Sequence, residues 1–233
     1  MSTFWLTFKL KSDGTLGRGD GLAGVVDTEV QHDEYGLPYL SGKTLKGLLG
    51  AECAEILFAL QTSQPERMTE WHRAAKRLFG EPGSGTSEAG ILHIGDARLP
   101  RSLRAAIAAD FAGQPLDKRG QLQRATLESL TAFRRQTAMD AATGAPKRNT
   151  LRTMRVILRD TAFEAELTCL GSLSDQERGL LAACVRAFRR AGTGRNRGRG
   201  RLVADLYEAY PISESIQPST GQWFDLFRKA VPA

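Results

Sequence analysis

The order of the expected secondary-structure elements constrains the fold of this chain more than any other feature. Apolar and polar side chains alternate over Thr3–Lys11, which predicts a half-buried strand. Apolar residues at helical spacing follow over Lys43–Leu60 and predict a helix. Gly90–Leu99 has the composition of a strand and is ended by Pro100. The first hundred residues therefore predict one strand–helix–strand unit.

The C-terminal part of the chain predicts a second unit of the same kind. Thr161–Leu170 alternates as a core strand, and Leu202–Tyr210 predicts the last strand. Between them, Ser174 with Glu177 three residues later predicts a capping box, which starts a helix over Asp175–Arg190. Two such units predict an α+β, ferredoxin-like (RRM-like) fold with a β-α-β-β-α-β core, in which two helices cover one face of an antiparallel sheet.

The segment between the two units, residues 100–160, is too long for a simple connection, so we expect it to be functional. Helices are expected over 102–112 and 120–133. Residues 134–159 then hold seven basic side chains and one acidic one, around the turn-rich sequence ATGAPKRN. This pattern predicts a protruding basic β-hairpin, a thumb that contacts nucleic acid. We expect a single domain over residues 1–233 that carries this insert.

The segment Ala191–Leu202, AGTGRNRGRGRL, alternates glycine with arginine, and no acidic residue occurs between Arg186 and Ala204. Glycine lets a backbone turn tightly and approach a ligand closely. Arginine offers a planar, permanently charged fork that matches phosphate oxygens. Because a helix and a strand are expected on either side, we predict an ordered loop that binds a polyanion rather than a flexible linker.

The charge balance and the cysteines narrow the class of protein further. The net charge of +6 and the isoelectric point of about 9.5 come from an excess of arginine, which favours a nucleic-acid partner. The three cysteines lack CxxC spacing and lie on apolar faces, so we expect buried, reduced thiols and no metal site. The sequence has neither a signal peptide pattern nor a long apolar run, which predicts a cytoplasmic protein without a membrane partner.

The start of the first helix is a second candidate anion site. Ser41 is the expected N-cap, and Lys43 and Lys46 follow in the first turn. Lysines oppose the helix dipole there, so an anion is expected to compensate them, and the free N–H groups at a helix start favour an oxyanion. The alternative is that both lysines are simply solvated.

Two motifs carry a resemblance to a known family. GLPYLSGKTLKGLL, at residues 36–49, resembles the PYIPGSSLKG signature of CRISPR-associated RAMP proteins. GTGRNRGRGRL, at residues 192–202, is similar to their C-terminal glycine-rich loop. The resemblance covers nearly the whole chain. It implies an RNA-binding subunit of a multisubunit, RNA-guided effector complex in antiviral defence, which holds CRISPR RNA through the glycine-rich loop and the start of the first helix.

Within the family, two longer stretches, residues 20–40 and 134–160, are most similar to type III-D-like subunits that cap the 5′ handle of the guide. The compact length and the basic hairpin also suit a backbone subunit, so both alternatives stay open. The resemblance and the charge pattern together give the expected RNA-binding residues. These are Ser41, Lys43, Lys46, Arg134, Arg135, Arg148, Arg152, Arg155, Arg190, Arg195, Asn196, Arg197 and Arg199. Expected partners are CRISPR RNA, target RNA, other effector subunits and a separate nuclease subunit.

Catalysis by this chain is a further alternative. In backbone subunits of type III complexes, an aspartate in the loop after the first strand cuts target RNA, and Asp27 has a similar context in GVVDTEVQHD. Its carboxylate would bind a divalent cation, the one cofactor considered, or would position the attacking 2′-hydroxyl. A turn-capping role for Asp27 is equally compatible with the sequence.

Three other hypotheses complete the set. A guide-processing endoribonuclease would need a histidine as general acid–base, and His32 is the one in a loop near the expected RNA path, whereas His93 is expected in the core. The hairpin would wedge Met139 or Met154 between nucleotides. Finally, the composition also fits a general RNA-binding domain outside CRISPR biology.

Overall fold

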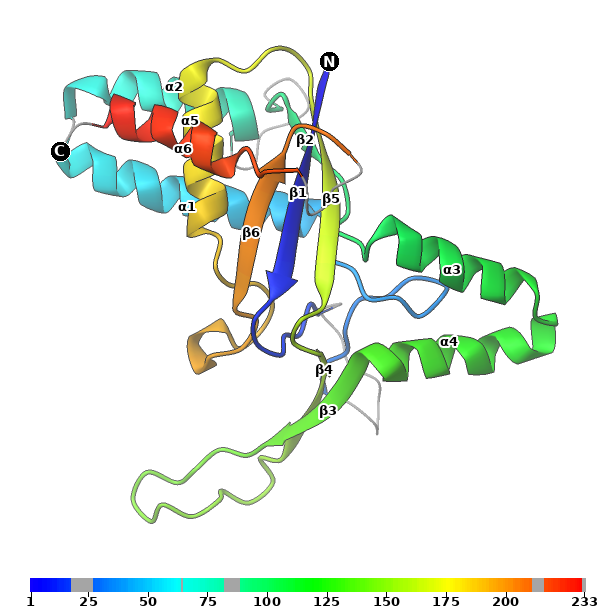
Figure 1. The fold of residues 1–233 in the computed structure, drawn as a ribbon. Helices are drawn as coiled ribbons and strands as arrows, with labels where there is room; N and C mark the ends of the chain where they lie inside the picture. Colours follow the sequence, from blue (N-terminus) through cyan, green and yellow to red (C-terminus); the bar gives the residue numbers. More distant parts are fainter. Residues whose placement is uncertain (18–26, 64, 82–88, 211–215, 232–233) are drawn as a thin grey trace.

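The computed structural model describes residues 1–17, 27–63, 65–81, 89–210 and 216–231 (Figure 1). Its centre is a four-stranded sheet in the order β2-β5-β1-β6, formed by β2 (Leu92–Ile94), β5 (Ala162–Cys169), β1 (Ser2–Leu10) and β6 (Leu202–Tyr207). Each neighbouring pair is antiparallel. Chain order and strand order together are those of a ferredoxin-like sheet, which confirms the predicted fold class.

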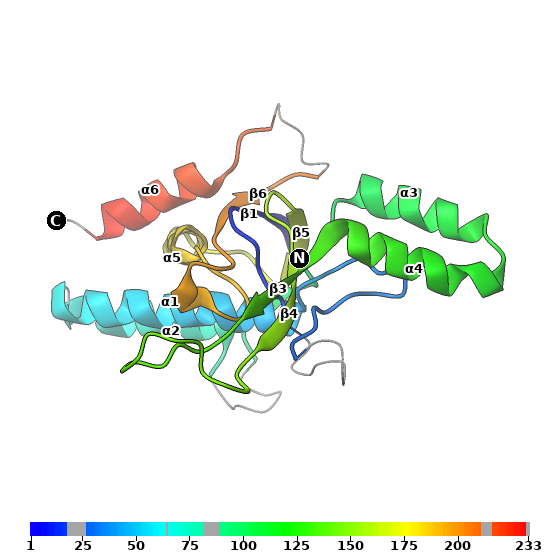
Figure 2. The ribbon, with the colours of Figure 1, turned by 90° about the horizontal axis from the view of Figure 1, so that it is seen from below.

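Helices α1 (Gly42–Ser63) and α5 (Asp175–Ala187) pack on one face of this sheet. Figure 2 shows α1 and α5 on one side of the strands and the insert helices on the other. The short η1 turn (Pro65–Arg67), α2 (Met68–Phe79) and α6 (Thr220–Ala230) extend the helical layer. None of the described helices is long and apolar enough to span a bilayer.

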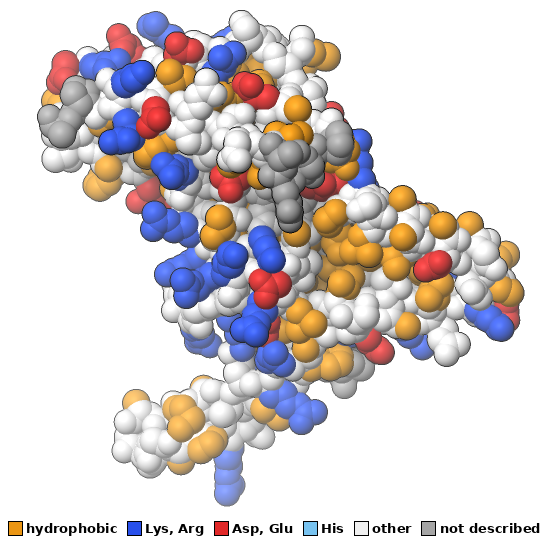
Figure 3. Space-filling view, viewed as in Figure 1, with side chains coloured by type: hydrophobic (Ala, Val, Ile, Leu, Met, Phe, Trp, Pro, Cys, Tyr) orange, Lys and Arg blue, Asp and Glu red, His pale blue; other side chains and the backbone are white. Residues whose placement is uncertain are grey.

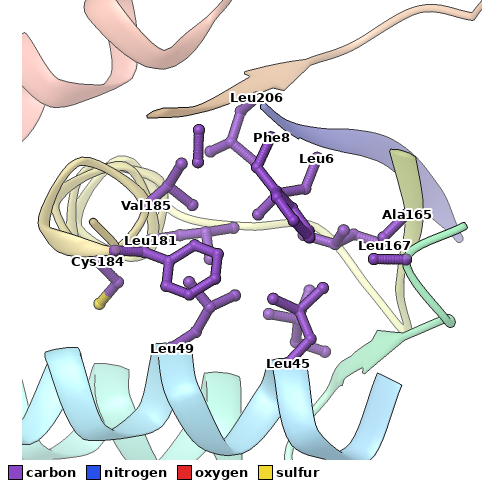
Figure 4. Packing of buried hydrophobic residues seen from close by; sticks show 14 of the residues in the cluster. Leu6, Phe8, Leu45, Leu49, Ala165, Leu167, Leu181, Cys184, Val185 and Leu206 are labelled. Atoms are coloured by element: carbon purple, nitrogen blue, oxygen red, sulfur yellow. The ribbon is translucent and has the colours of Figure 1, made fainter. Parts of the chain in front are cut away.

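The core forms where the alternating face of β1 meets the apolar stripes of the two helices. Figure 4 shows Leu45 and Leu49 of α1 pointing toward Leu181 of α5 and toward Phe8 on the sheet. Phe8 also stacks on Phe163 of β5, with ring centroids 4.9 Å apart. Fully burying one such side chain contributes about 1.5–3 kcal/mol, so this layer accounts for the position of both helices.

Helix α5 begins at Asp175, as the sequence predicts, and ends earlier than predicted. Ser174 Oγ accepts the Glu177 N–H at 3.3 Å, and Glu177 Oε2 accepts the Ser174 N–H at 2.8 Å, so the capping box is confirmed. The helix ends at Ala187 rather than Arg190, because the chain turns there so that the Arg189 carbonyl can accept the Leu202 N–H at 2.9 Å. This early end starts the glycine-rich loop.

The edge strand β2 is much shorter than the predicted Gly90–Leu99. After Ile94 the chain leaves the regular ladder, although Gly95 still donates to the Glu166 carbonyl at 2.8 Å. His93 is exposed, so the prediction that it lies in the core is wrong. Its neighbour Leu92 is the buried residue, because successive side chains of a strand point to opposite faces.

Residues 100–160 form two helices and a hairpin, α3 (Arg101–Ala112), α4 (Leu116–Leu130), β3 (Thr131–Gln136) and β4 (Arg152–Ile157). The hairpin projects away from the main sheet (Figure 1). Helix α4 starts four residues earlier than predicted and stops at Leu130, where the chain enters β3. The predicted helical ending at Phe133 is therefore wrong.

The C-terminal aromatic residues cover the core, as their apolar character suggests, and they do so from an additional helix, α6. Trp223 of α6 is 3% exposed and packs edge-to-face on Phe4, with ring centroids 5.1 Å apart. The three cysteines are buried and free, as predicted.

Candidate nucleic-acid interface

The glycine-rich loop is an ordered turn around a short 3-10 helix, Arg195–Arg197. Gly194 and Gly198 flank this turn with φ angles of 75° and 77°, a left-handed conformation that favours glycine. The Arg197 N–H donates to the Gly194 carbonyl at 2.8 Å. The side chains of the turn are exposed, so the loop presents its charges to solvent. A flexible linker is therefore not what this segment forms.

Two other glycines let the base of the loop pack against backbone. A Cβ at Gly192 would lie 2.2 Å from the Thr15 carbonyl oxygen, and a Cβ at Gly200 would lie 1.9 Å from the Ala191 carbonyl oxygen. Both distances are far inside van der Waals contact. The glycines thus divide into two at the tip, where space is open or bounded by a flexible side chain, and two at the base, where no side chain fits.

Residues just after β1 hold the loop in place. Ser12 Oγ donates to the Gly198 carbonyl and accepts the Arg201 N–H, both at 3.0 Å. The Gly200 N–H donates to the Asp13 carbonyl at 2.9 Å. These partners are more than 180 residues apart in sequence, so no local pattern indicated them.

Asp13 also connects the loop to the hairpin. Its Oδ2 lies 2.8 Å from Arg134 Nη2, and its Oδ1 accepts the Arg159 N–H at 3.0 Å. The neighbouring Gly14 forms a two-way backbone bridge with Ile157, the last residue of β4. One short segment therefore fixes both basic elements, and Arg134 shares its charge with Asp13.

The loop and the hairpin base enclose one groove of about 630 Å³. It is formed by three segments that are distant in sequence. Its lining residues are Thr28, Gln136, Arg152, Met154, Gly192, Thr193, Gly194, Arg195, Asn196, Arg197 and Arg199. Figure 3 shows Lys and Arg side chains gathered over this end of the sheet, the glycine-rich loop and the hairpin base. The arginines predicted in the loop and at Arg152 thus face a common space.

Arg155 differs from the other predicted arginines because its charge is compensated inside the protein. Its Nε lies 2.8 Å from Glu29 Oε1, and the two side chains are 11% and 7% exposed. The guanidinium also donates to Thr131 Oγ1 at 3.1 Å and lies 4.4 Å from the Phe133 ring centroid. The sequence did not indicate Glu29 as a partner. This pair fixes the root of the hairpin.

The two methionines considered as wedges have different surroundings. Met154 is 9% exposed at the hairpin base, where Arg199 contacts its sulfur atom. Met139 is 60% exposed and pairs with Pro146 across the outer part of the hairpin. Only Met139 of the two therefore projects where a nucleotide could stack on it.

Four more of the predicted arginines are exposed. Arg135, Arg148 and Arg152 lie on the hairpin, and Arg190 lies at the base of the loop, where it donates to the Arg195 carbonyl at 3.4 Å. The hairpin tip itself is ordered by Asp140, whose carboxylate accepts the backbone N–H groups of Thr143 and Ala142. These hydrogen bonds favour the charged form and lower the pKa of Asp140.

The first turn of α1 is capped by the protein and is not part of the groove. Ser41 Oγ accepts the Thr44 N–H at 3.3 Å, and Asp96 Oδ1 accepts the Gly42 N–H at 3.0 Å. Lys43 is exposed, whereas burial lowers the pKa of Lys46. Two of the N–H groups expected to hold an oxyanion are therefore already engaged.

The charges of the glycine-rich loop act on Glu52 of α1. Burial and Glu55 raise the pKa of Glu52, whereas Arg195 and Arg189 lower it, so Arg195 is within electrostatic range of the third turn. Ser41, Lys43 and Lys46, which were expected to bind RNA together with the loop, are not among the residues that line the groove.

Asp27 lies beside this groove, at the hairpin base. Its Oδ2 accepts the Thr153 N–H at 2.7 Å, its own N–H donates to the Thr153 carbonyl at 2.8 Å, and Thr28 bridges to Met154. Asp27 is exposed. Across the described residues, no group of three or more His, Cys, Asp or Glu side chains could hold a metal ion.

Comparison with known proteins places the chain in a family. The sequence profile of the RAMP superfamily matches residues 7–203, so the chain belongs to the RAMP superfamily. No curated protein matches it.

Solved structures share its fold. A chain in the cryo-EM structure of the Type III-B Cmr-beta bound to cognate target RNA has 13% sequence identity and a TM-score of 0.60, with 88% of this chain and 97% of that chain covered. A chain in the Type III-B Cmr-beta cryo-EM structure of the apo state gives 12% identity, the same TM-score and the same coverage. These matches show that the fold is shared nearly from end to end.

Proposed function

We propose that this RAMP protein is an RNA-binding subunit of a type III CRISPR effector complex, and that the guide RNA crosses the groove between the glycine-rich loop and the hairpin base. The observation that carries the proposal is the meeting of three distant segments around one space lined by Arg152, Arg195, Arg197 and Arg199. Family membership and the shared fold with a chain of an effector complex bound to target RNA support it.

The chemistry of the groove suits the RNA backbone. Arginine forks bind phosphate oxygens, while Asn196 and Thr193 offer groups that hydrogen-bond to 2′-hydroxyls. Contacts of this type position an RNA strand without reading its sequence. Ser41, Lys43 and Lys46 would contact a more distant part of the same strand, because they lie outside the groove.

The hairpin would contact the duplex that the guide forms with target RNA. Met139 would stack against a nucleotide, and Arg135 and Arg148 would bind nearby phosphates. Arg134 and Arg155 would act through Asp13 and Glu29, by holding the hairpin in position. The same arrangement serves a cap at the 5′ handle or a repeated backbone subunit. Other effector subunits, among them a nuclease, would complete the assembly.

The test is to co-express the protein with the products of neighbouring genes, purify the complex and sequence the bound RNA. We expect RNA of uniform length that begins with the repeat-derived handle. Replacing Arg195 and Arg197 with Ala should remove most of this RNA, whereas Arg228→Ala, an exposed change on α6, is the matched control. Heterogeneous RNA, or full RNA retention by the double variant, would contradict the proposal.

Target cleavage by Asp27 is a second candidate function, favoured by the position of its carboxylate at the edge of the groove. The carboxylate would position the attacking 2′-hydroxyl or share a divalent cation with the RNA. Asp27→Asn keeps the size of the side chain, so it should abolish cleavage in the assembled complex while RNA binding persists. Unchanged cleavage by this variant would eliminate the hypothesis.

Guide processing by His32 is a weaker alternative. His32 is half-buried, with Nδ1 3.1 Å from the Asp33 carbonyl oxygen, and it bridges to Pro38 just before α1. Incubating the isolated protein with repeat RNA tests it, since a processing enzyme cuts at one position and His32→Ala would stop the cut.

A further inference from the structure

A second and larger hollow borders the base of the glycine-rich loop. It has a volume of about 1340 Å³ and lies between α1, α5, α6 and the edge strand β6. In Figure 1 these elements surround the left side of the sheet above the loop. It shares Gly198 with the loop, but Arg152 and Arg197 of the RNA groove are not among its lining residues. Substitutions at Arg152 or Arg197 can therefore change the groove without changing the lining of this hollow.

The walls of this hollow are apolar. Ile56 and Leu60 line it from α1, and Phe224 and Phe227 line it from α6, where the two rings stack with centroids 5.8 Å apart. Phe188 contributes to the floor. Apolar walls of this kind suit the buried centre of a protein–protein contact better than a polynucleotide, which carries a charge on every residue.

The rim of the hollow is strongly basic. Lys11, Arg186, Arg189, Arg190 and Arg201 are all exposed and belong to its lining. Among the described lining residues, Asp205 is the one carboxylate, and it accepts a hydrogen bond from Thr220 Oγ1 at 2.9 Å. This rim is complementary to an acidic occupant.

The edge of β6 adds a backbone handle. The Leu202 N–H donates to the Arg189 carbonyl at 2.9 Å, and the Leu206 N–H donates to Thr220 Oγ1 at 2.7 Å. Both groups point away from β1. Because the direction of backbone groups alternates along a strand, the N–H and C=O of Ala204 also point away from β1, on the side of the hollow. An extended chain can pair with them.

We propose that this hollow binds an extended, acidic segment of a partner protein. Apolar side chains at alternate positions of the segment enter between α1 and α6, its carboxylates meet the arginine rim, and its backbone pairs with Ala204. The proposal does not depend on the RNA-binding function of the groove. It assigns one face of the protein to a protein partner and the adjacent face to RNA.

A short fluorescein-labelled peptide of alternating Glu and Leu is the probe, with Lys–Leu and Glu–Ser peptides and an oligo(U) RNA as comparisons. Fluorescence anisotropy should show binding of the Glu–Leu peptide and much weaker binding of the other two peptides. Arg186→Glu reverses a rim charge that lies 4.6 Å from the Phe224 ring, and it should weaken the Glu–Leu peptide about tenfold. Arg228→Glu, on α6 outside the lining, should leave binding within about twofold.

A second variant tests the apolar walls separately from the charge of the rim. Phe224→Ser should weaken the Glu–Leu peptide and leave the Glu–Ser peptide unchanged, with circular dichroism confirming the fold. Arg197→Ala should retain full peptide binding, which separates this site from the RNA groove.

Several outcomes would overturn the proposal. Equal affinity for the Glu–Ser peptide would show a surface attraction without a binding cleft. Loss of oligo(U) binding in Arg186→Glu would assign the hollow to RNA. Self-association that Arg186→Glu abolishes, measured by sedimentation velocity, would assign it to a second copy of the chain.

Discussion

The glycine-rich loop and the β-hairpin are both rich in arginine, but the two regions use that charge differently. In the loop, backbone groups make the anchoring contacts to Ser12 and Asp13, and the side chains of Arg195 and Arg197 stay exposed. In the hairpin, the side chains of Arg134 and Arg155 make the anchoring contacts, to Asp13 and Glu29. A basic segment therefore has to be separated into charges that hold it and charges that remain for a ligand.

Of the changes that test this difference, removing Glu29 should have the largest effect, a loss of unfolding free energy. Glu29→Ala leaves Arg155 as a buried charge without its partner, which costs about 3–5 kcal/mol of unfolding free energy. Chemical denaturation followed by circular dichroism measures this loss. Asp225→Ala breaks an exposed pair with Arg228 and is the control, with an expected change below about 1 kcal/mol. A small effect at Glu29 would mean that the hairpin does not depend on this ion pair.

The glycines at the base and at the tip of the loop should differ next. Gly198→Ala meets open space, so it adds only the strain of a left-handed alanine, about 1–2 kcal/mol. Gly200→Ala adds to that strain a clash with the Ala191 carbonyl and should cost about 3 kcal/mol or more. Thermal unfolding of both variants measures the difference. Equal midpoints would contradict the tight packing of the loop base.

RNA binding should then divide the arginines into the same two groups. Arg197→Ala removes a free charge, so it should flatten the slope of log affinity against log salt by about 0.7–0.9. Arg134→Ala should leave that slope nearly unchanged, because Asp13 already compensates Arg134. Filter binding of single-stranded RNA across a salt series measures both. If the two slopes fell equally, the proposed division would fail.

The smallest effect is expected at the hairpin tip. Arg148 is fully outside the groove, so Arg148→Ala should leave the affinity for single-stranded RNA within about twofold. A guide–target duplex should lose more, since the proposed function places the tip against it. Parallel titrations with the strand and the duplex measure this contrast, and equal losses would remove the tip from the duplex.

Much of the fold was predictable, because its signals are local. The alternation in β1 and β5, the stripe on α1 and the capping box at Ser174 each depend on residues only a few positions apart. The end of α5 and the boundary between α4 and β3 depend on distant partners, and the sequence prediction missed both.

The site was predictable in its charges and not in its architecture. The exposed arginines of the loop and Arg152 line the groove, as charge and glycine content suggested. Ser12, Asp13 and Glu29 were missed, because their roles appear only when residues more than 100 positions apart come together. At the start of α1, the predicted cap Ser41 accepts the Thr44 N–H, whereas the second cap, Asp96, follows β2 and was missed for the same reason.

Asp13 contacts both the hairpin and the loop. Its side chain holds Arg134, while its backbone carbonyl accepts the Gly200 N–H. The positions of the two basic elements therefore share one residue, and a change of the backbone at Asp13 would displace both of them together.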